Sequence, residues 1–193
     1  MPNWIRNRLV IKGKNASQIF YDKYVTVNEK GEENFDFNKV IECPKELEDT
    51  PYSSDTPKEV YQRNKAKYGY EQWYDWRVAY WGTKWNACET EINTIDNDTI
   101  EISFETAWHS IKLSFIEEMS NQCKGLEFEI WFADEDIGSN VGHSITQKGF
   151  TPLIDYPKPL SKQAYELAFE MWDCKNEYIF NEDKGTYEYN EDY

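Results

Sequence analysis

The residues that could do chemistry gather around one aromatic stretch of the chain. Residues 68–85 read YGYEQWYDWRVAYWGTKW, in which eight of eighteen residues are Tyr or Trp. A lysine held among indole rings can bind an anion or a nucleobase through cation–π and stacking contacts. The sequence therefore allows a small-ligand site or an enzyme site in this region, with these candidate residues: Asp75, Trp81, Lys84, Trp85, Asn86 and His109.

The same stretch also has a purely structural interpretation, which we favour on sequence grounds. Under it, Trp81, Trp85 and Trp108 pack together beneath a sheet. Gly82 then ends a helix, and Lys84 lays its aliphatic stem along the rings while its ammonium group reaches solvent.

Catalysis would need a nucleophile with a base beside it. His109 could act as a general base, with Asp75 to orient it and Cys88 as the nucleophile. Nothing in the sequence brings these three groups within hydrogen-bonding distance, and Asp75 could equally form a buried ion pair with Arg77. The sequence also lacks a P-loop, a Rossmann glycine pattern and a zincin motif. We therefore assign no catalytic residue and do not expect an enzyme.

A second candidate site is an acidic surface. The net charge is −15, and residues 101–150 and 151–193 each contribute −6 of it. Such a field repels nucleic-acid phosphates and acidic membranes and attracts basic proteins. The alternative, that the acidity only confers solubility, stays open. The candidate protein-binding residues are Glu101, Glu105, Glu127, Glu129, Asp134, Glu135 and Asp136.

The cysteines and histidines do not form metal-ligand patterns. Four cysteines lie far apart in the sequence, and the two histidines, His109 and His143, are isolated. Zinc sites usually draw their ligands in close pairs, so we expect neither a metal nor a cofactor.

The sequence shows no signal-peptide core and no apolar run long enough to span a membrane, which predicts a cytoplasmic protein with reduced thiols.

The elements that must position these residues follow from the hydrophobic periodicity. Residues 4–12 and 126–132 read as strands, and residues 100–106 alternate cleanly with the acids on one side. Helical spacing marks residues 110–122 and 160–180, and Gly69 interrupts a helical pattern over residues 58–80. Two βαβ units joined by a central hairpin predict an α+β, ferredoxin-like antiparallel sheet with helices on one face.

Several motifs resemble a known family. MPNW, FDFNKVIECPKEL, YGYEQWYDWRVAYWGTKWNA and FETAW are similar to the YubB ferredoxin-like domain family, proteins of unknown function carried by phages and plasmids. Ile5, Cys43 and His109 depart from the family pattern. The resemblance covers residues 1–150, with an aromatic helical insertion at about 45–85. Residues 151–193 would form an acidic helical appendage with a frayed tail.

The resemblance implies a fold and a genomic setting, and no activity. From that setting and the charge we predict a non-enzymatic mobile-element protein that obstructs a basic host protein or a nucleic-acid-handling complex. A counter-defence inhibitor of the anti-CRISPR type would fit this description. It would act in the host cytoplasm, without binding nucleic acid or membrane directly, and the sequence leaves its oligomeric state open.

Overall fold

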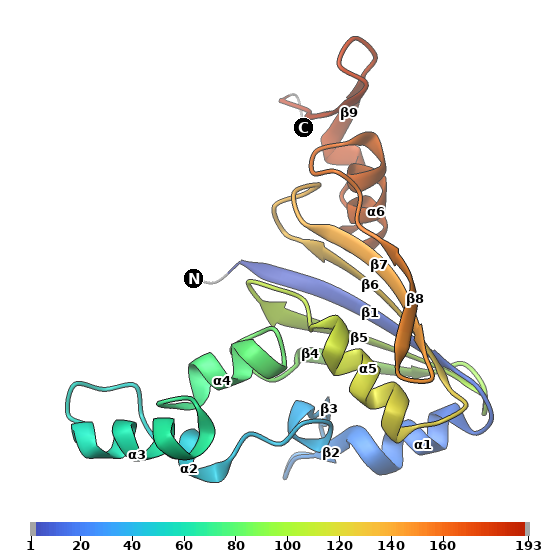
Figure 1. Cartoon of the computed structure of the whole chain (residues 1–193). Helices are drawn as coiled ribbons and strands as arrows, with labels where there is room; N and C mark the ends of the chain where they lie inside the picture. The colour runs from blue at the N-terminus through green and yellow to red at the C-terminus, as the bar shows by residue number, and fades with distance from the viewer. Residues whose placement is uncertain (1–2, 192–193) are drawn as a thin grey trace.

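A six-stranded antiparallel sheet forms the centre of the computed structural model, which describes residues 3–191 (Figure 1). The first two residues of the MPNW motif and the last two of the predicted tail lie outside the described residues. In spatial order the strands are β4 (Cys88–Thr94), β5 (Thr99–Ala107), β1 (Trp4–Lys12), β6 (Glu127–Asp134), β7 (Val141–Gln147) and β8 (Phe150–Asp155).

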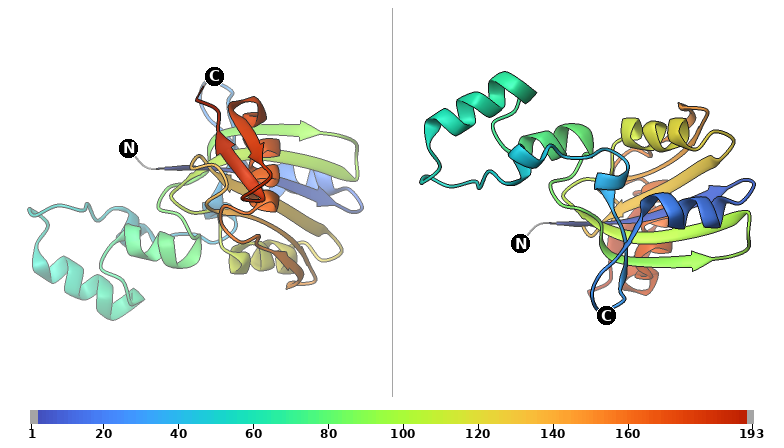
Figure 2. Two further views of the ribbon diagram at one scale, coloured as in Figure 1. Left: turned by 90° about the horizontal axis from the view of Figure 1, so that it is seen from above. Right: turned by 90° about the horizontal axis from the view of Figure 1, so that it is seen from below.

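Helices cover the two faces of this sheet differently. Helices α1 (Ala16–Tyr24) and α5 (Leu113–Gln122) lie on one face, as predicted. Helix α6 (Lys162–Trp172) packs on the opposite face over β6, β7 and β1, which the two views of Figure 2 show from above and from below. The order β1-α1-β4-β5-α5-β6, with β5 and β6 flanking β1, is the ferredoxin-like plan.

The alternation of each strand decides what faces the main core. In β1, Ile5, Asn7, Leu9 and Ile11 are buried, while the alternate residues Arg6, Arg8 and Val10 are partly exposed. Because successive side chains of a strand point to opposite faces, one face of the sheet can be apolar while the other is charged. Strand β5 repeats this pattern, with its glutamates on the side away from α1 and α5.

The main core is built from aromatic rings. Phe35 lies 5.1 Å from Phe37, 5.3 Å from Phe20 and 5.4 Å from Phe104, measured between ring centroids. Phe37 lies 5.1 Å from Phe115 of α5. Edge-to-face pairs of this kind contribute about 0.5–1.5 kcal/mol each beyond the burial of their surface. These rings join the helices to the sheet through a short pair of strands, β2 (Val25–Val27) and β3 (Glu33–Phe35), and the 3-10 turn η1 (Phe37–Lys39).

The predicted insertion projects from the sheet as an arm, which we define as residues 45–72 (Figures 1 and 2). It contains α2 (Lys45–Glu48) and α3 (Lys58–Tyr68), and it leads into α4 (Trp73–Tyr80) beside the sheet. Gly69 ends α3 in a left-handed conformation, at the break that the sequence predicted. Asn64 is buried and donates hydrogen bonds of 2.9 Å to Thr50 Oγ1 and 3.0 Å to the carbonyl of Glu71, which hold the arm together.

The C-terminal segment is more ordered than the sequence predicted. The tail predicted to fray instead forms a hairpin, β9 (Tyr178–Asn181) and β10 (Thr186–Tyr189), that follows the 3-10 turn η2 (Lys175–Glu177). Tyr178 and Tyr187 lie 5.2 Å and 5.0 Å from Phe169 of α6, measured between ring centroids. Tyr178 and Tyr187 of the tail thus pack against α6. The acidic composition of the tail concealed this packing.

Residues 3–191 contain no helix with the length and hydropathy that a membrane crossing requires.

Candidate functional site

A tight turn at Gly82 and Thr83 sets the position of Lys84. Gly82 has φ +96°, and a Cβ atom there would lie 2.8 Å from both the backbone nitrogen of Lys112 and the carbonyl oxygen of Ser110. Only glycine fits this conformation in this space. Thr83 Oγ1 donates to the carbonyl of Ala107 at 3.0 Å and accepts from its N–H at 3.2 Å. The turn is therefore fixed to the end of β5.

The ammonium group of Lys84 lies between two indole rings. Its Nζ is 3.9 Å from the ring centroid of Trp85 and 3.9 Å from that of Trp108. Each such cation–π contact contributes about 0.5–2 kcal/mol, depending on how far the site is desolvated. Among residues 3–191, no hydrogen bond or ion pair of Lys84 accompanies these contacts. The rings thus hold a positive charge in place while leaving its N–H donors open.

Trp108 is kept in an unusual conformation. It has φ +71°, a left-handed value that costs a bulky residue roughly 1–2 kcal/mol, and 41% of its surface is exposed. Its backbone N–H donates to the carbonyl of Asn3 at 2.8 Å. Strained backbone conformations are frequent at functional sites. Because Trp108 is strained, partly exposed and in contact with Lys84, we include it in the candidate site.

A cleft of about 470 Å³ opens beside Lys84. The side chain of Gln72 accepts a hydrogen bond of 2.8 Å from the N–H of Tyr74 and so starts α4 there. Because of this start, the first turn of α4 supplies one wall of the cleft. Tyr52 of the arm, 83% exposed, stands at the other side. The cleft is lined by Tyr52, Gln72, Trp73, Tyr74, Asp75, Lys84 and Trp85.

The structure brings together only half of the candidate ligand residues. Asp75, Lys84 and Trp85 share the cleft. Trp81 is fully buried, and its indole N–H donates to the carbonyl of Ile41 at 2.8 Å. His109 is exposed and does not line the cleft.

Asn86 has a structural role instead. Its Oδ1 accepts a hydrogen bond of 2.8 Å from the N–H of Phe37, and its Nδ2 donates to Asp36 at 2.8 Å. Both ends of the amide are therefore used to hold the segment before β4 against η1. Trp81 and Asn86 thus support the site without lining it.

The structural interpretation of the three tryptophans is wrong in part. Trp81 is buried, but Trp85 is half-buried and Trp108 is exposed, so the three do not pack together beneath the sheet. The ammonium group of Lys84 lies between the rings of Trp85 and Trp108. The reason is the turn at Gly82, which packs closely on residues 110–112 before α5 and leads directly into Lys84 and Trp85.

The predicted pair of Asp75 with Arg77 is also wrong. Arg77 Nη2 donates to Glu48 of α2 at 2.5 Å, and its guanidinium lies 5.0 Å and 4.8 Å from the ring centroids of Trp73 and Trp81. Residues two apart on a helix point to different sides, which is why Asp75 is exposed and Arg77 turns inward.

No catalytic trio forms. Within the described residues, no hydrogen bond joins Cys88, His109 and Asp75, and Cys88 Sγ approaches only the carbonyl of Asn86, at 3.5 Å. Burial raises the pKa of the Cys88 thiol, and the charges of Glu89 and Glu105 raise it further. A raised thiol pKa lowers the thiolate fraction at neutral pH, so Cys88 is a poor nucleophile.

The predicted acidic face is partly neutralised. Glu101, Glu105, Glu127 and Glu129 do lie on the sheet face away from α1 and α5. Glu105 pairs with Arg6 at 3.3 Å, and Glu129 pairs with Lys12 at 2.8 Å and with His143 at 3.0 Å. The sequence reasoning missed these cations, although Arg6, Arg8 and Lys12 alternate along the first strand as the glutamates do along theirs.

Two further acids of the predicted surface behave differently. Asp134 is buried and accepts a hydrogen bond of 2.9 Å from the N–H of Asp136, so it does not belong to an exposed surface. An Asp at the end of a strand commonly accepts from the backbone two residues on, which explains its burial. Glu135 and Asp136 are exposed, as expected.

Both ring faces of Trp131, on the sheet face away from α1 and α5, are covered by other side chains. The guanidinium of Arg8, on β1, lies 4.4 Å from the ring centroid of Trp131. The imidazole of His143, on β7, stacks on the same indole at a centroid distance of 4.6 Å and an interplanar angle of 8°. These are its register partners on the two neighbouring strands, so both faces of the indole are covered. Base stacking on a ferredoxin-like sheet needs an open ring face.

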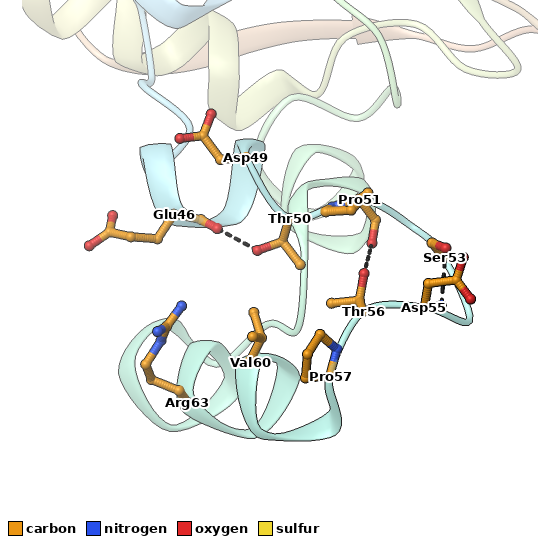
Figure 3. A pocket seen from close by; sticks show the side chains of 10 residues that line it. All are labelled: Glu46, Asp49, Thr50, Pro51, Ser53, Asp55, Thr56, Pro57, Val60 and Arg63. Carbon is orange, nitrogen blue, oxygen red and sulfur yellow. Dashed lines mark hydrogen bonds between the residues drawn. The ribbon is translucent and has the colours of Figure 1, made fainter.

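The arm contains a second hollow, of about 530 Å³, which Figure 3 shows from close by. Its polar groups mainly bond to one another: Thr50 Oγ1 donates to the carbonyl of Glu46 at 2.6 Å, and Thr56 Oγ1 to that of Pro51 at 3.0 Å. Arg63 on α3 stands across from Glu46, whose carboxylate is paired with Lys67 at 2.6 Å. The hollow lacks the rings and the fixed charge of the cleft beside Lys84.

No cluster of metal-ligating side chains occurs in residues 3–191.

Comparisons with known proteins agree with this fold. A family model described as the ferredoxin-like domain in Api92-like protein matches residues 81–190, more than half of the chain. The match includes residues 151–190, which the sequence assigned to an appendage. The crystal structure of protein api92 from Yersinia pseudotuberculosis superposes with a TM-score of 0.51 and 10% identity, covering 81% of this chain and 98% of that one. No curated protein matches in sequence. The chain therefore belongs to the family of Api92-like proteins that carry this ferredoxin-like domain.

Proposed function

We propose that the protein binds a small ligand in the cleft beside Lys84, and that this ligand combines a flat unsaturated ring with one anionic group. One observation carries the proposal: the Lys84 ammonium is held 3.9 Å from the centroids of two indole rings, with no acidic partner among the described residues. Most of the other functional groups of the cleft are aromatic, which suits a flat ring.

The positive charge of Lys84 is held in place before any ligand binds. A lysine side chain normally loses about 2 kcal/mol of rotamer entropy when it is fixed, and here the rings have already fixed it. An anionic group at Nζ would gain charge-assisted hydrogen bonds. The net charge of −15 disfavours polyanions such as nucleic acids, which limits the ligand to a small one with little charge.

Calorimetric titration with matched probe pairs tests this proposal. Nicotinate and nicotinamide differ mainly in the charge of the substituent, as do uridine monophosphate and uridine. We expect the charged member of at least one pair to bind about tenfold more tightly than its neutral partner. In the Lys84→Met variant, which keeps the apolar stem between the rings, that preference should disappear.

The control is Lys58→Met, which removes an exposed lysine of the arm that does not line the cleft. It should bind both members as the unmodified chain does. Equal affinity for the two members of each pair, an unchanged preference in Lys84→Met, or no binding of any probe in the millimolar range would contradict the proposal.

The acidic-surface function predicted from the sequence stays a prediction. It is supported by the net charge and by four acids that form no ion pair among the described residues: Glu101, Glu127, Glu135 and Asp136. The resemblance to the YubB family, whose members are carried by phages and plasmids, supports the setting of a counter-defence inhibitor. Reversing the four charges should weaken binding to a purified basic defence complex, most strongly at low salt, and unchanged affinity would exclude this surface.

A further inference from the structure

A second cation held by a tryptophan lies on the sheet face against which α6 packs. There a cleft of about 440 Å³ separates the last turn of α6 from strands β1, β5 and β4. Two arginines and four glutamates line it: Arg6, Arg8, Glu89, Glu91, Glu105 and Glu170. The two signs of charge are not evenly matched within it, and this mismatch defines what the cleft can bind.

Arg6 and Glu105 form a wall rather than a binding group. Arg6 Nε pairs with Glu105 at 3.3 Å, and its Nη1 donates to the carbonyl of Met171 at 3.3 Å. Its guanidinium also lies 4.1 Å from the ring centroid of Trp172. These contacts use Nε and Nη1 of Arg6 and attach α6 to the sheet.

Arg8 is free in the same cleft. It stacks on Trp131, which His143 supports from behind, and His143 is held in turn by Glu129 at 3.0 Å. Among residues 3–191, no hydrogen bond or ion pair of Arg8 occurs, and its Nε is buried without an acceptor. Because that Nε is closed to solvent, a ligand in the cleft would have to bind the Nη1 and Nη2 groups of Arg8.

Three glutamates of the cleft are also free. Within the described residues Glu89, Glu91 and Glu170 form no ion pair, although they line the same hollow as Arg8. Glu89 has φ +46° and sits in the irregularity of β4 between Cys88 and Glu91. Bulges of this kind redirect side chains and are frequent beside functional sites.

We propose that this cleft binds a small zwitterion, namely a free α-amino acid. Its carboxylate would lie on the two terminal nitrogens of Arg8, Nη1 and Nη2, which can donate two parallel hydrogen bonds to a carboxylate. Its ammonium group would lie among Glu89, Glu91 and Glu170. A simple anion would meet three uncompensated carboxylates and a simple cation would leave Arg8 unpaired, so a ligand with both charges fits best. The volume also suits a molecule of this size.

The test is a titration of the full chain, followed through backbone amide resonances, with each of the standard free amino acids. We expect at least one of them to shift the amides of β1 and β4 that border the cleft. Its N-acetyl derivative, which lacks the ammonium group, and its amide derivative, which lacks the carboxylate, should each bind about tenfold more weakly or worse. If no free amino acid shifts these amides at concentrations up to about 10 mM, the proposal is wrong.

Variants assign the two charges separately. Arg8→Met keeps apolar packing on Trp131 and should abolish the shifts, while Glu91→Gln and Glu170→Gln should weaken them. Arg63→Met, an exposed arginine of the arm, is the matched control and should bind normally. A dispersed amide spectrum for each variant shows that it folds. Equal binding of the N-acetyl derivative would identify a site for a peptide C-terminus and would overturn the proposal, as would normal binding by Arg8→Met.

Discussion

Arg6 Nη1 donates a hydrogen bond of 3.3 Å to the carbonyl oxygen of Met171, and this bond joins the first strand to the last turn of α6, 165 residues away. The last carbonyls of a helix have no partner within the helix and carry the negative end of its dipole. A guanidinium placed there satisfies one of them and interacts favourably with the dipole. Stacking of the same group on Trp172 completes the attachment of α6 to the sheet.

Replacing Arg6 should therefore loosen α6 more than it lowers global stability. In Arg6→Met we expect the free energy of unfolding to fall by about 1–2 kcal/mol, because a helix-end contact and a cation–π contact are lost. The ion pair with Glu105 adds little, since 43% of the Arg6 side chain is exposed. Amide hydrogen exchange should accelerate in residues 162–172 and not in α1 or α5. Lys58→Met is the control and should change neither quantity.

Two glycines with left-handed backbone give a matched test of the turn before Lys84. Gly82 has φ +96° and Gly69 has φ +79°, so alanine is strained at both. At Gly69 nothing lies within 4 Å of the added Cβ, whereas at Gly82 two backbone atoms lie at 2.8 Å. Gly69→Ala should cost about 1 kcal/mol, and Gly82→Ala at least about 2 kcal/mol more. Chemical denaturation measures both, and equal costs would mean that the turn at Gly82 is not closely packed.

Glu129, on the sheet face that α6 partly covers, should make stability depend on pH. Burial raises the pKa of Glu129, but hydrogen bonds from Lys12 and His143, together with their charges, outweigh it and hold this pKa below its usual value of 4.5. A carboxyl whose pKa is lowered on folding stabilises the protein fully above pH 4.5, and that stabilisation is lost as the pH falls through the folded-state pKa.

Glu129→Gln should thus lower the free energy of unfolding near neutral pH by about 0.5–1 kcal/mol. The difference from the unmodified chain should shrink as the pH drops below 4.5. Urea titrations at a series of pH values measure this. A cost that is the same at all pH values would show that Glu129 acts through packing and not through its charge.

The cysteines should resist alkylation in the folded protein. All four are free thiols. Burial raises the pKa of Cys43 to about 11, against a smaller opposing effect of Arg77, and burial also raises the pKa of Cys88. Because the thiolate is the reactive form, iodoacetamide at neutral pH should label Cys43 and Cys88 slowly in the native protein and fast in urea. Mass spectrometry of each cysteine gives the rates. Fast native labelling of Cys88 would restore it as a candidate nucleophile.

The sequence by itself determined the order of the main strands and helices of the ferredoxin-like core and the facing of the strand residues, but not the short strands β2, β3, β8, β9 and β10. The alternation in β5 placed Ile100, Ile102 and Phe104 inward and put Glu101 and Glu105 on the other face, as the structure has them. This succeeded because strand and helix periods are local properties of the chain. The ferredoxin-like arrangement followed from the order of such elements.

Only the tertiary structure decided which aromatic and charged groups lie together. Trp81 is fully buried, while Trp108 is 41% exposed. The hydrophobic periodicity does not predict this difference, because the burial of these residues depends on how the turn at Gly82 packs on residues 110–112. Likewise the pairing of Arg6 with Glu105 joins residues 99 apart. Contacts between strands distant in sequence depend on the register in which the strands pair, and a single sequence contains no local signal for that register.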